Sequence, residues 1–72
     1  MEENLLLKEI GRRLKERRKL LSITQAQLSY ACDTDPSYIR KVEAGKVNIS
    51  LVRLAKILKV LDITIHEFSK DL

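Results

Sequence analysis

The chain has 72 residues with a formal net charge of +4 at pH 7, and the sequence pI is near 9.5. This length has room for one hydrophobic core, so we expect a single domain over residues 1–72, and the excess of cations favours an anionic partner. The lone Cys32 excludes an intramolecular disulfide. No apolar run is long enough for a membrane span or a signal peptide. We therefore expect a cytoplasmic protein that does not bind a membrane.

The first predicted helix runs from about Asn4 to Leu21. Its apolar residues recur on one stripe at Leu7, Ile10, Leu14 and Leu21. Cations crowd its other faces between residues 12 and 19. Those that point away from the stripe form either a solvated face, which we favour, or a surface that faces phosphates: they are Arg12, Lys15 and Lys19.

Arg17 and Arg18 lie about 50° to either side of the apolar stripe, taking helical residues at 100° intervals. A cation at the border of the core needs an anionic partner, and Glu43 is the natural candidate. Geometry does not choose between the two arginines.

Residues 24–43 have the pattern of a helix-turn-helix motif. Thr24 and Gln27 form a capping box at the start of its first helix, and Asp33-Thr34 interrupts the helical periodicity. Asp35 is a good N-cap and Pro36 suits the first position of the second helix, which we expect over about residues 35–44 and name the recognition helix. Gly45 is the expected glycine at its C-terminal end.

The two faces of the recognition helix differ in chemistry. Ile39 and Val42 fall on one side and would seat the helix on the core. The opposite side gathers Ser37, Arg40 and Lys41, all of them hydrogen-bond donors. A helix with such an outward face fits the major groove of B-DNA, where arginine and lysine donate to guanine acceptors.

The remaining residues predict two further helices. Ser50 is the N-cap of a fourth helix, whose expected core residues are Leu51, Leu54, Ile57, Leu58 and Leu61. Its wet side carries Arg53, Lys56 and Lys59, which we interpret as residues for solubility alone. Thr64 and Glu67 form a second capping box before a short fifth helix that contains Phe68. No alternating strand pattern occurs, so the fold class is all-α, a compact five-helix domain with a helix-turn-helix.

Together these features resemble the Cro/phage-repressor type, or XRE, family of helix-turn-helix transcription regulators. The similarity runs from about Ile10 to Phe68, and its residues are Arg18, Thr24-Gln25, Leu28, Tyr38-Ile39, Val42-Glu43, Gly45-Lys46, Asn48, Ser50-Leu51, Leu54, Ile57, Leu61, Thr64 and Glu67-Phe68. Asp33 and Ser22 stand where the family commonly has glycine, and Ile49 where it commonly has proline. These departures concern local turn geometry, and the implied fold is that of a phage-repressor DNA-binding domain.

The resemblance implies a set of contacts with double-stranded DNA. Gln25, Lys46 and Asn48 match phosphate-contacting positions, and Arg18 matches the arginine that pairs with Glu43. The Tyr38 hydroxyl either reaches the DNA backbone or its ring simply packs. We assign base contacts to Ser37, Arg40 and Lys41, with Thr34 and Pro36 as apolar contacts to a thymine methyl; Arg40 and Lys41 alternatively bend back to phosphate.

The leading functional hypothesis is a sequence-specific transcription regulator that binds a near-palindromic operator as a homodimer, with recognition helices about 34 Å apart. Candidate interface residues are apolar positions that the core does not obviously use, and they are otherwise scattered surface hydrophobes: Val47, Ile49, Val52, Val60 and Ile65. The spacing around Tyr38, Glu43 and Asn48 is similar to that of restriction-modification controller proteins, although phage repressors and antitoxins share much of it.

The alternative hypothesis is a protein-interaction module, or an antitoxin-like partner-binding protein, that pairs through the fourth and fifth predicted helices. We expect no enzyme activity, because no nucleophile, base and orienting group can be assembled from these residues. His66 has no metal-ligand companions, so we expect no metal. Cys32 matches a small buried family position, which favours inert packing over a redox sensor. Because nearly all of the chain resembles a DNA-binding domain, we expect no cofactor or small-molecule ligand.

Overall fold

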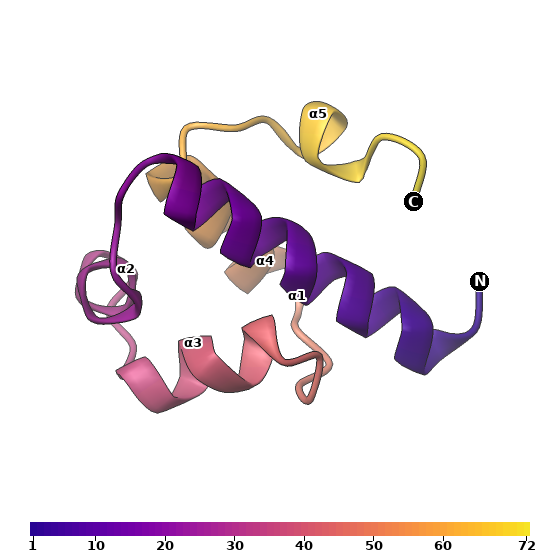
Figure 1. Cartoon of the computed structure of the whole chain (residues 1–72), viewed down its shortest axis with the longest axis horizontal. Helices are drawn as coiled ribbons and strands as arrows, with labels where there is room; N and C mark the ends of the chain where they lie inside the picture. Colours follow the sequence, from indigo (N-terminus) through magenta and orange to yellow (C-terminus); the bar gives the residue numbers. More distant parts are fainter.

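The computed structural model describes all 72 residues and contains five α-helices and no strand (Figure 1). The helices are α1 (Glu3–Leu20), α2 (Gln25–Ala31), α3 (Pro36–Glu43), α4 (Leu51–Val60) and α5 (Ile65–Ser69). The prediction of an all-α fold with five helices is therefore confirmed. None of these helices combines the length and the apolar character that crossing a lipid bilayer requires.

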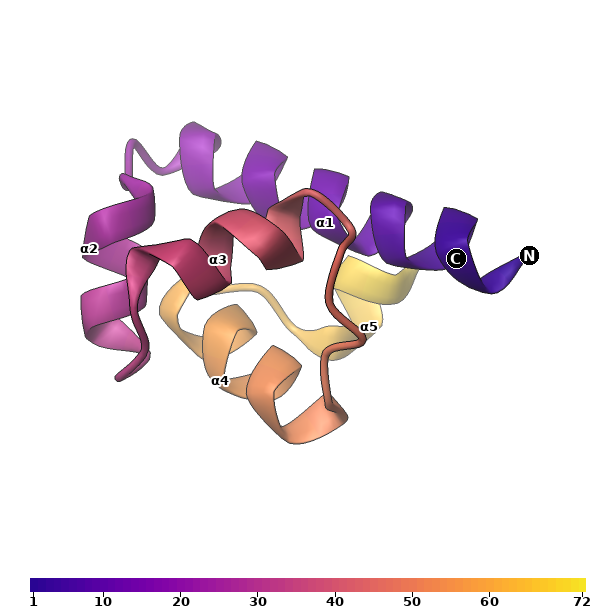
Figure 2. The ribbon, with the colours of Figure 1, turned by 90° about the horizontal axis from the view of Figure 1, so that it is seen from below.

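Every helix contributes to one hydrophobic core. Its buried members are Leu14, Leu28, Ile39, Val42, Leu54, Ile57, Leu58, Leu61 and Phe68. The expectation that Leu51 belongs to this core is wrong, because its side chain is 70% exposed. Leu51 is the first residue of α4, and Figure 2 shows this end of the helix projecting away from the other helices. Helical periodicity predicts on which face of α4 a residue lies, but it does not predict whether another helix packs against that end of α4.

Side-chain oxygens cap the N-termini of the helices that the sequence marked. Thr24, Asp35, Ser50 and Thr64 each accept a hydrogen bond from the backbone N–H three residues on, at 3.0–3.1 Å. At α2 the Gln27 side chain also accepts from the Thr24 backbone N–H, which completes a capping box. At α5 the Glu67 carboxylate instead accepts from the Thr64 hydroxyl at 3.1 Å, so the reciprocal backbone bond of that predicted box does not form.

Four helices end in the same hydrogen-bonded turn, a Schellman motif. In each, the residue after the C-cap has a positive φ, and the next N–H returns to a carbonyl five residues earlier. The positive-φ residues are Ser22 (58°), Asp33 (54°), Gly45 (73°) and Asp62 (53°). Ser22 and Asp33 thus adopt the left-handed conformation without being glycine, which costs roughly 1–2 kcal/mol per residue for a side chain that cannot compensate locally.

A buried ion pair joins α1 to α3. Arg18 Nε donates to Glu43 Oε2 at 2.7 Å and Arg18 Nη2 donates to Glu43 Oε1 at 3.0 Å, which is a bidentate geometry. The third donor, Nη1, reaches the Ile23 carbonyl at 2.9 Å. The hydrogen bonds to Glu43 raise the pKa of Arg18, so this guanidinium stays charged. Figures 1 and 2 show α1 and α3 as neighbouring helices, which agrees with the contacts between them.

Two further arginines of α1 bind backbone carbonyls, a role that the sequence did not indicate. Arg17 donates to the Leu61 and Asp62 carbonyls at 2.8 Å each, just past the end of α4. Arg13 donates to the Phe68 and Lys70 carbonyls at 2.8 and 2.6 Å, at the end of α5. Orphan carbonyls at a helix C-terminus carry partial negative charge and suit a cation. These contacts fasten the C-terminal segment to α1.

Gly11 lies within α1 at its closest approach to α3. A Cβ atom at this position would lie 2.5 Å from the carbonyl oxygens of both Val42 and Glu43, which are backbone atoms that cannot move aside alone. The glycine therefore permits the short distance between the two helices that the Arg18–Glu43 pair bridges.

We expect Gly11→Ala to destabilise the protein by about 1–3 kcal/mol, as overpacking does, even though alanine favours a helix by about 1 kcal/mol. Urea unfolding followed by circular dichroism at 222 nm measures the free energy of unfolding. Lys15→Ala, at an exposed position of the same helix, is the control and should change it by less than about 0.5 kcal/mol. A Gly11→Ala protein as stable as the control would contradict the packing argument.

The cap of α3 predicts a pH dependence. The Asp35 carboxylate accepts hydrogen bonds from the Ser37 hydroxyl and the Tyr38 N–H, and these bonds, Ser37 first, lower the pKa of Asp35 below its ordinary value. A lowered pKa in the folded state means that the contribution to stability is present above the unfolded value, about 3.9, and is lost as the pH falls through the folded value.

We therefore expect wild type to exceed Asp35→Asn in stability at pH 7, and expect this difference to shrink as the pH falls from about 4 to 2. Asparagine caps a helix but does not titrate. The other carboxylates are the same in both proteins, so their effects cancel in the difference in stability between wild type and Asp35→Asn. Thermal unfolding of both proteins at a series of pH values measures it. A difference that stays constant with pH would show that the carboxylate charge is irrelevant to the cap.

Candidate nucleic-acid interface

The recognition helix α3 is seated through its apolar side. Ile39 and Val42 are buried in the core, whereas Ser37, Arg40 and Lys41 are exposed. Asp35 and Pro36 start the helix as the N-cap and its first residue. Figure 2 shows no other helix covering the side of α3 that faces the viewer. The first turn and the outward face of α3 are thus open to a large ligand.

The cations of α3 differ from those of α1 in their electrostatic environment. On α1, Arg12 contacts Glu9 and Glu16 at 2.8 Å, and Arg13 contacts Glu9 at 2.7 Å. The hydrogen bonds from Arg12 and then Arg13 lower the pKa of Glu9 to about 2, so this carboxylate remains ionised.

Neither Arg40 nor Lys41 has a carboxylate within 4.0 Å, and the same holds for Lys46 in the loop that follows α3. All three side chains are exposed. The cations that form no ion pair therefore include those on the outward face of α3 and at the start of the α3–α4 loop.

Gln25, the first residue of α2, is tied to the ion pair between α1 and α3. Its Nε2 donates to Glu43 Oε1 at 3.1 Å, the same oxygen that accepts from Arg18 Nη2. A glutamine amide nitrogen has two N–H donors, and only one is used here. Thus Arg18, Glu43 and Gln25 form one hydrogen-bonded network across three helices.

The other proposed DNA contacts lie around α3. Thr34 is half-buried in the turn before the helix, and Pro36 is exposed. In the loop after the helix, Lys46 and Asn48 are exposed and alternate with Val47 and Ile49, which pack partly against the core.

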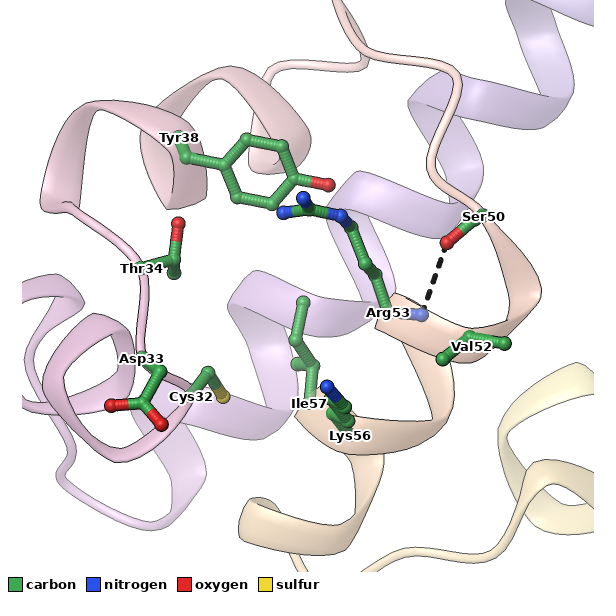
Figure 3. Close-up of a pocket in the computed structure, with 9 residues that line it drawn as sticks. All are labelled: Cys32, Asp33, Thr34, Tyr38, Ser50, Val52, Arg53, Lys56 and Ile57. Atoms are coloured by element: carbon green, nitrogen blue, oxygen red, sulfur yellow. Dashed lines mark hydrogen bonds between the residues drawn. The ribbon is translucent and has the colours of Figure 1, made fainter.

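Tyr38 borders a cleft between α3 and α4 (Figure 3). The cleft has a volume of about 290 Å³ and is lined by Cys32, Asp33, Thr34, Tyr38, Ser50, Val52, Arg53, Lys56 and Ile57. The Tyr38 ring is half-buried, and Arg53 Cζ lies 5.1 Å from its centroid, which is a cation–π distance. The interpretation of Arg53 as a residue for solubility alone missed this contact, for which the sequence holds no periodic signal.

Cys32 is half-buried at the same cleft. Burial, followed by the nearby negative charge of Asp33, raises the pKa of the Cys32 thiol. Because the thiolate is the reactive form, this environment disfavours redox chemistry at Cys32.

The apolar positions considered for a dimer interface fall into two groups. Val47, Ile49 and Val60 pack partly against the core of their own chain. Val52 and Ile65 are 67% and 47% exposed, and Leu51 beside Val52 is exposed as well. Val52 and Ile65 are therefore the two candidates with most apolar area left uncovered.

Comparison with known proteins gives consistent matches. A family model described as helix-turn-helix (HTH_3) matches residues 14–68. Control protein C.MunI from Mycoplasma sp is 38% identical over 63 residues, which cover 86% of this chain and 85% of that protein.

Solved structures share the arrangement of the five helices. The restriction-modification controller protein C.AhdI from Aeromonas hydrophila matches with a TM-score of 0.87 and 34% identity, over 94% of this chain and 99% of that one. The clp gene regulator ClgR from C. glutamicum matches in fold with a TM-score of 0.85 and 24% identity, over 88% and 81% of the two chains. The family resemblance inferred from the sequence is thus confirmed, and the chain belongs to the XRE-type helix-turn-helix family of DNA-binding transcription regulators.

Proposed function

We propose that this protein is a sequence-specific regulator of the restriction-modification controller type, which binds a near-palindromic operator in double-stranded DNA as a homodimer in the cytoplasm. The observation that carries the proposal is the outward face of α3, where Arg40 and Lys41 are exposed and lack carboxylate partners. Two of the proteins that it matches at more than 30% identity are named as controller proteins.

Base recognition is assigned to the N-terminal and outward part of α3. Arg40 and Lys41 donate to guanine acceptors in the major groove, and the Ser37 hydroxyl serves several bases. Thr34 and Pro36 offer apolar contacts to a thymine methyl. The accessible first turn of α3 supports this arrangement, because helix-turn-helix proteins contact base edges with the N-terminal residues of the recognition helix.

Phosphate contacts on either side of α3 would fix its orientation in the groove. Gln25 has a free N–H donor at the first position of α2, and its other donor is held by Glu43. Lys46, Asn48 and the Tyr38 hydroxyl are the remaining phosphate ligands of the proposal. A protein anchored in this way neutralises several phosphates, so its affinity falls steeply with salt.

A homodimer follows from the small footprint of one recognition helix. A single copy of α3 covers only a few base pairs, and a twofold axis doubles the length of the operator while making it near-palindromic. The exposed side chains of Val52 and Ile65 support an apolar interface, with Val47, Ile49 and Val60 at its edge.

We expect Arg40→Ala with Lys41→Ala to weaken operator binding by about 100-fold or more, since each lost bidentate contact costs roughly 1–3 kcal/mol. The operator is first selected from a random pool of duplexes and checked for inverted symmetry, and affinities are then measured by fluorescence anisotropy at several salt concentrations.

The matched control is Lys59→Ala with Lys70→Ala, which removes the same charge from exposed positions outside the proposed interface. The control should bind the operator within a few-fold of wild type. Equal affinities of the two double variants, or wild-type binding that does not depend on salt, would refute recognition by α3. An interaction module would instead keep its protein partner in both variants.

The dimer is tested by Ile65→Asp, which places a charge in the proposed interface. We expect wild type to sediment as a dimer and Ile65→Asp to sediment as a monomer with weaker operator binding, because burying an unpaired carboxylate costs several kcal/mol. Leu5→Asp, at an exposed apolar position of α1, should remain dimeric. A monomeric wild type at micromolar concentration, or a dimeric Ile65→Asp protein, would contradict this interface.

A further inference from the structure

Arg53 is held in place at both of its ends. Its backbone N–H donates to the Ser50 hydroxyl at 3.1 Å in the first turn of α4, and its guanidinium lies over the Tyr38 ring of α3. Figure 3 shows the side chain extending from α4 across the cleft to the ring. Any residue at this position would make the capping bond, so it is the contact with the ring that sets Arg53 apart from the other exposed cations of α4.

The cation–π contact leaves the hydrogen-bonding capacity of Arg53 unused. The contact with the ring is made by the charge of the guanidinium, whose Cζ lies 5.1 Å from the ring centroid, and it occupies none of the five N–H donors in a hydrogen bond. None of these donors makes a hydrogen bond within the chain, and no carboxylate lies within 4.0 Å. Arg53 therefore presents a fork of donors that matches the oxygens of a phosphate group.

The charges around the cleft favour an anion on the Arg53 side. Lys56 is a second cation that lines the cleft. The one acidic lining residue, Asp33, lies at the opposite end of the cleft from Arg53 in Figure 3. Tyr38, which the proposed function already assigns to the DNA backbone, connects this cationic group to the recognition helix.

We propose that Arg53 is a further phosphate-binding residue of the DNA interface and that the Tyr38 ring positions it. This inference rests on the proposed function, since it adds a ligand for the backbone of the same duplex. The ring restricts the guanidinium before DNA arrives, which reduces the conformational entropy lost on binding. The contribution is to affinity for any duplex, because a phosphate carries no sequence information.

The first test compares Arg53→Ala and Arg53→Gln with Lys59→Ala, which removes the same charge from the far end of α4. Both Arg53 variants should bind the selected operator and a random duplex several-fold more weakly, to the same extent. The slope of log affinity against log salt concentration should become shallower by about 0.9, the value for one phosphate. Lys59→Ala should keep the wild-type affinity and slope, and circular dichroism confirms that each variant is folded.

The second test separates the ring of Tyr38 from its hydroxyl. In a Tyr38→Phe background, Arg53→Ala should cause the same loss of affinity as in wild type, because the ring remains. In a Tyr38→Leu background the loss should be much smaller, since the guanidinium is no longer positioned. An equal loss in both backgrounds would overturn the positioning role of the ring.

The two proposals fail in different ways. If wild type binds no duplex, the proposed function is wrong and this inference falls with it. If wild type binds with a steep salt dependence while Arg53→Ala and Arg53→Gln match Lys59→Ala in affinity and slope, the inference alone is overturned. A weakening by the Arg53 variants that affects the operator but not random DNA would also overturn it, because base recognition would then be the cause.

Discussion

The ion pair between Arg18 and Glu43 is the interaction on which the presentation of α3 depends. It fixes α3 against α1 at the point where Gly11 lets the two backbones meet, and it orients Gln25 at the start of α2. A buried charge pair contributes little to stability when compared with an apolar pair, but it tolerates few alternative geometries. Here the pair restricts how α3 lies against α1. Loss of either partner would leave the other charge buried and unpaired.

The cations of this protein differ in whether they form contacts within the chain. On α1, Glu9 and Glu16 pair with neighbouring arginines, and Arg13 and Arg17 bind carbonyls at helix ends. The cations of α3 and of its following loop have no such partners. Net charge alone predicts a weak and general attraction to anions, whereas Arg40 and Lys41 place unpaired charge on the exposed face of a helix that is seated through its apolar side. The family to which the chain belongs and the unpaired cations of α3 both indicate the outward face of α3 as the surface that contacts DNA.

Local rules predicted most of the fold, because caps and helical periodicity act within a few residues. Thr24, Asp35, Ser50 and Gly45 marked the ends of helices correctly. Apart from the incomplete capping box at Thr64, what failed depended on neighbours distant in sequence: Leu51 has the right period but no covering helix, and the cation–π contact of Arg53 spans two helices. The outward position of Arg40 and Lys41 was predictable, since the buried partners Ile39 and Val42 fix the opposite face.

The attachment of the C-terminal segment to α1 determines when the core can form during synthesis of the chain on the ribosome. Helix α5 has five residues, too few to persist in water alone, and it is held by Phe68 in the core and by Arg13 on its carbonyls. A growing polypeptide therefore cannot close its core until residues near position 70 have left the ribosome. The contacts between the first and last helices therefore form only after nearly all of the 72 residues have been synthesised.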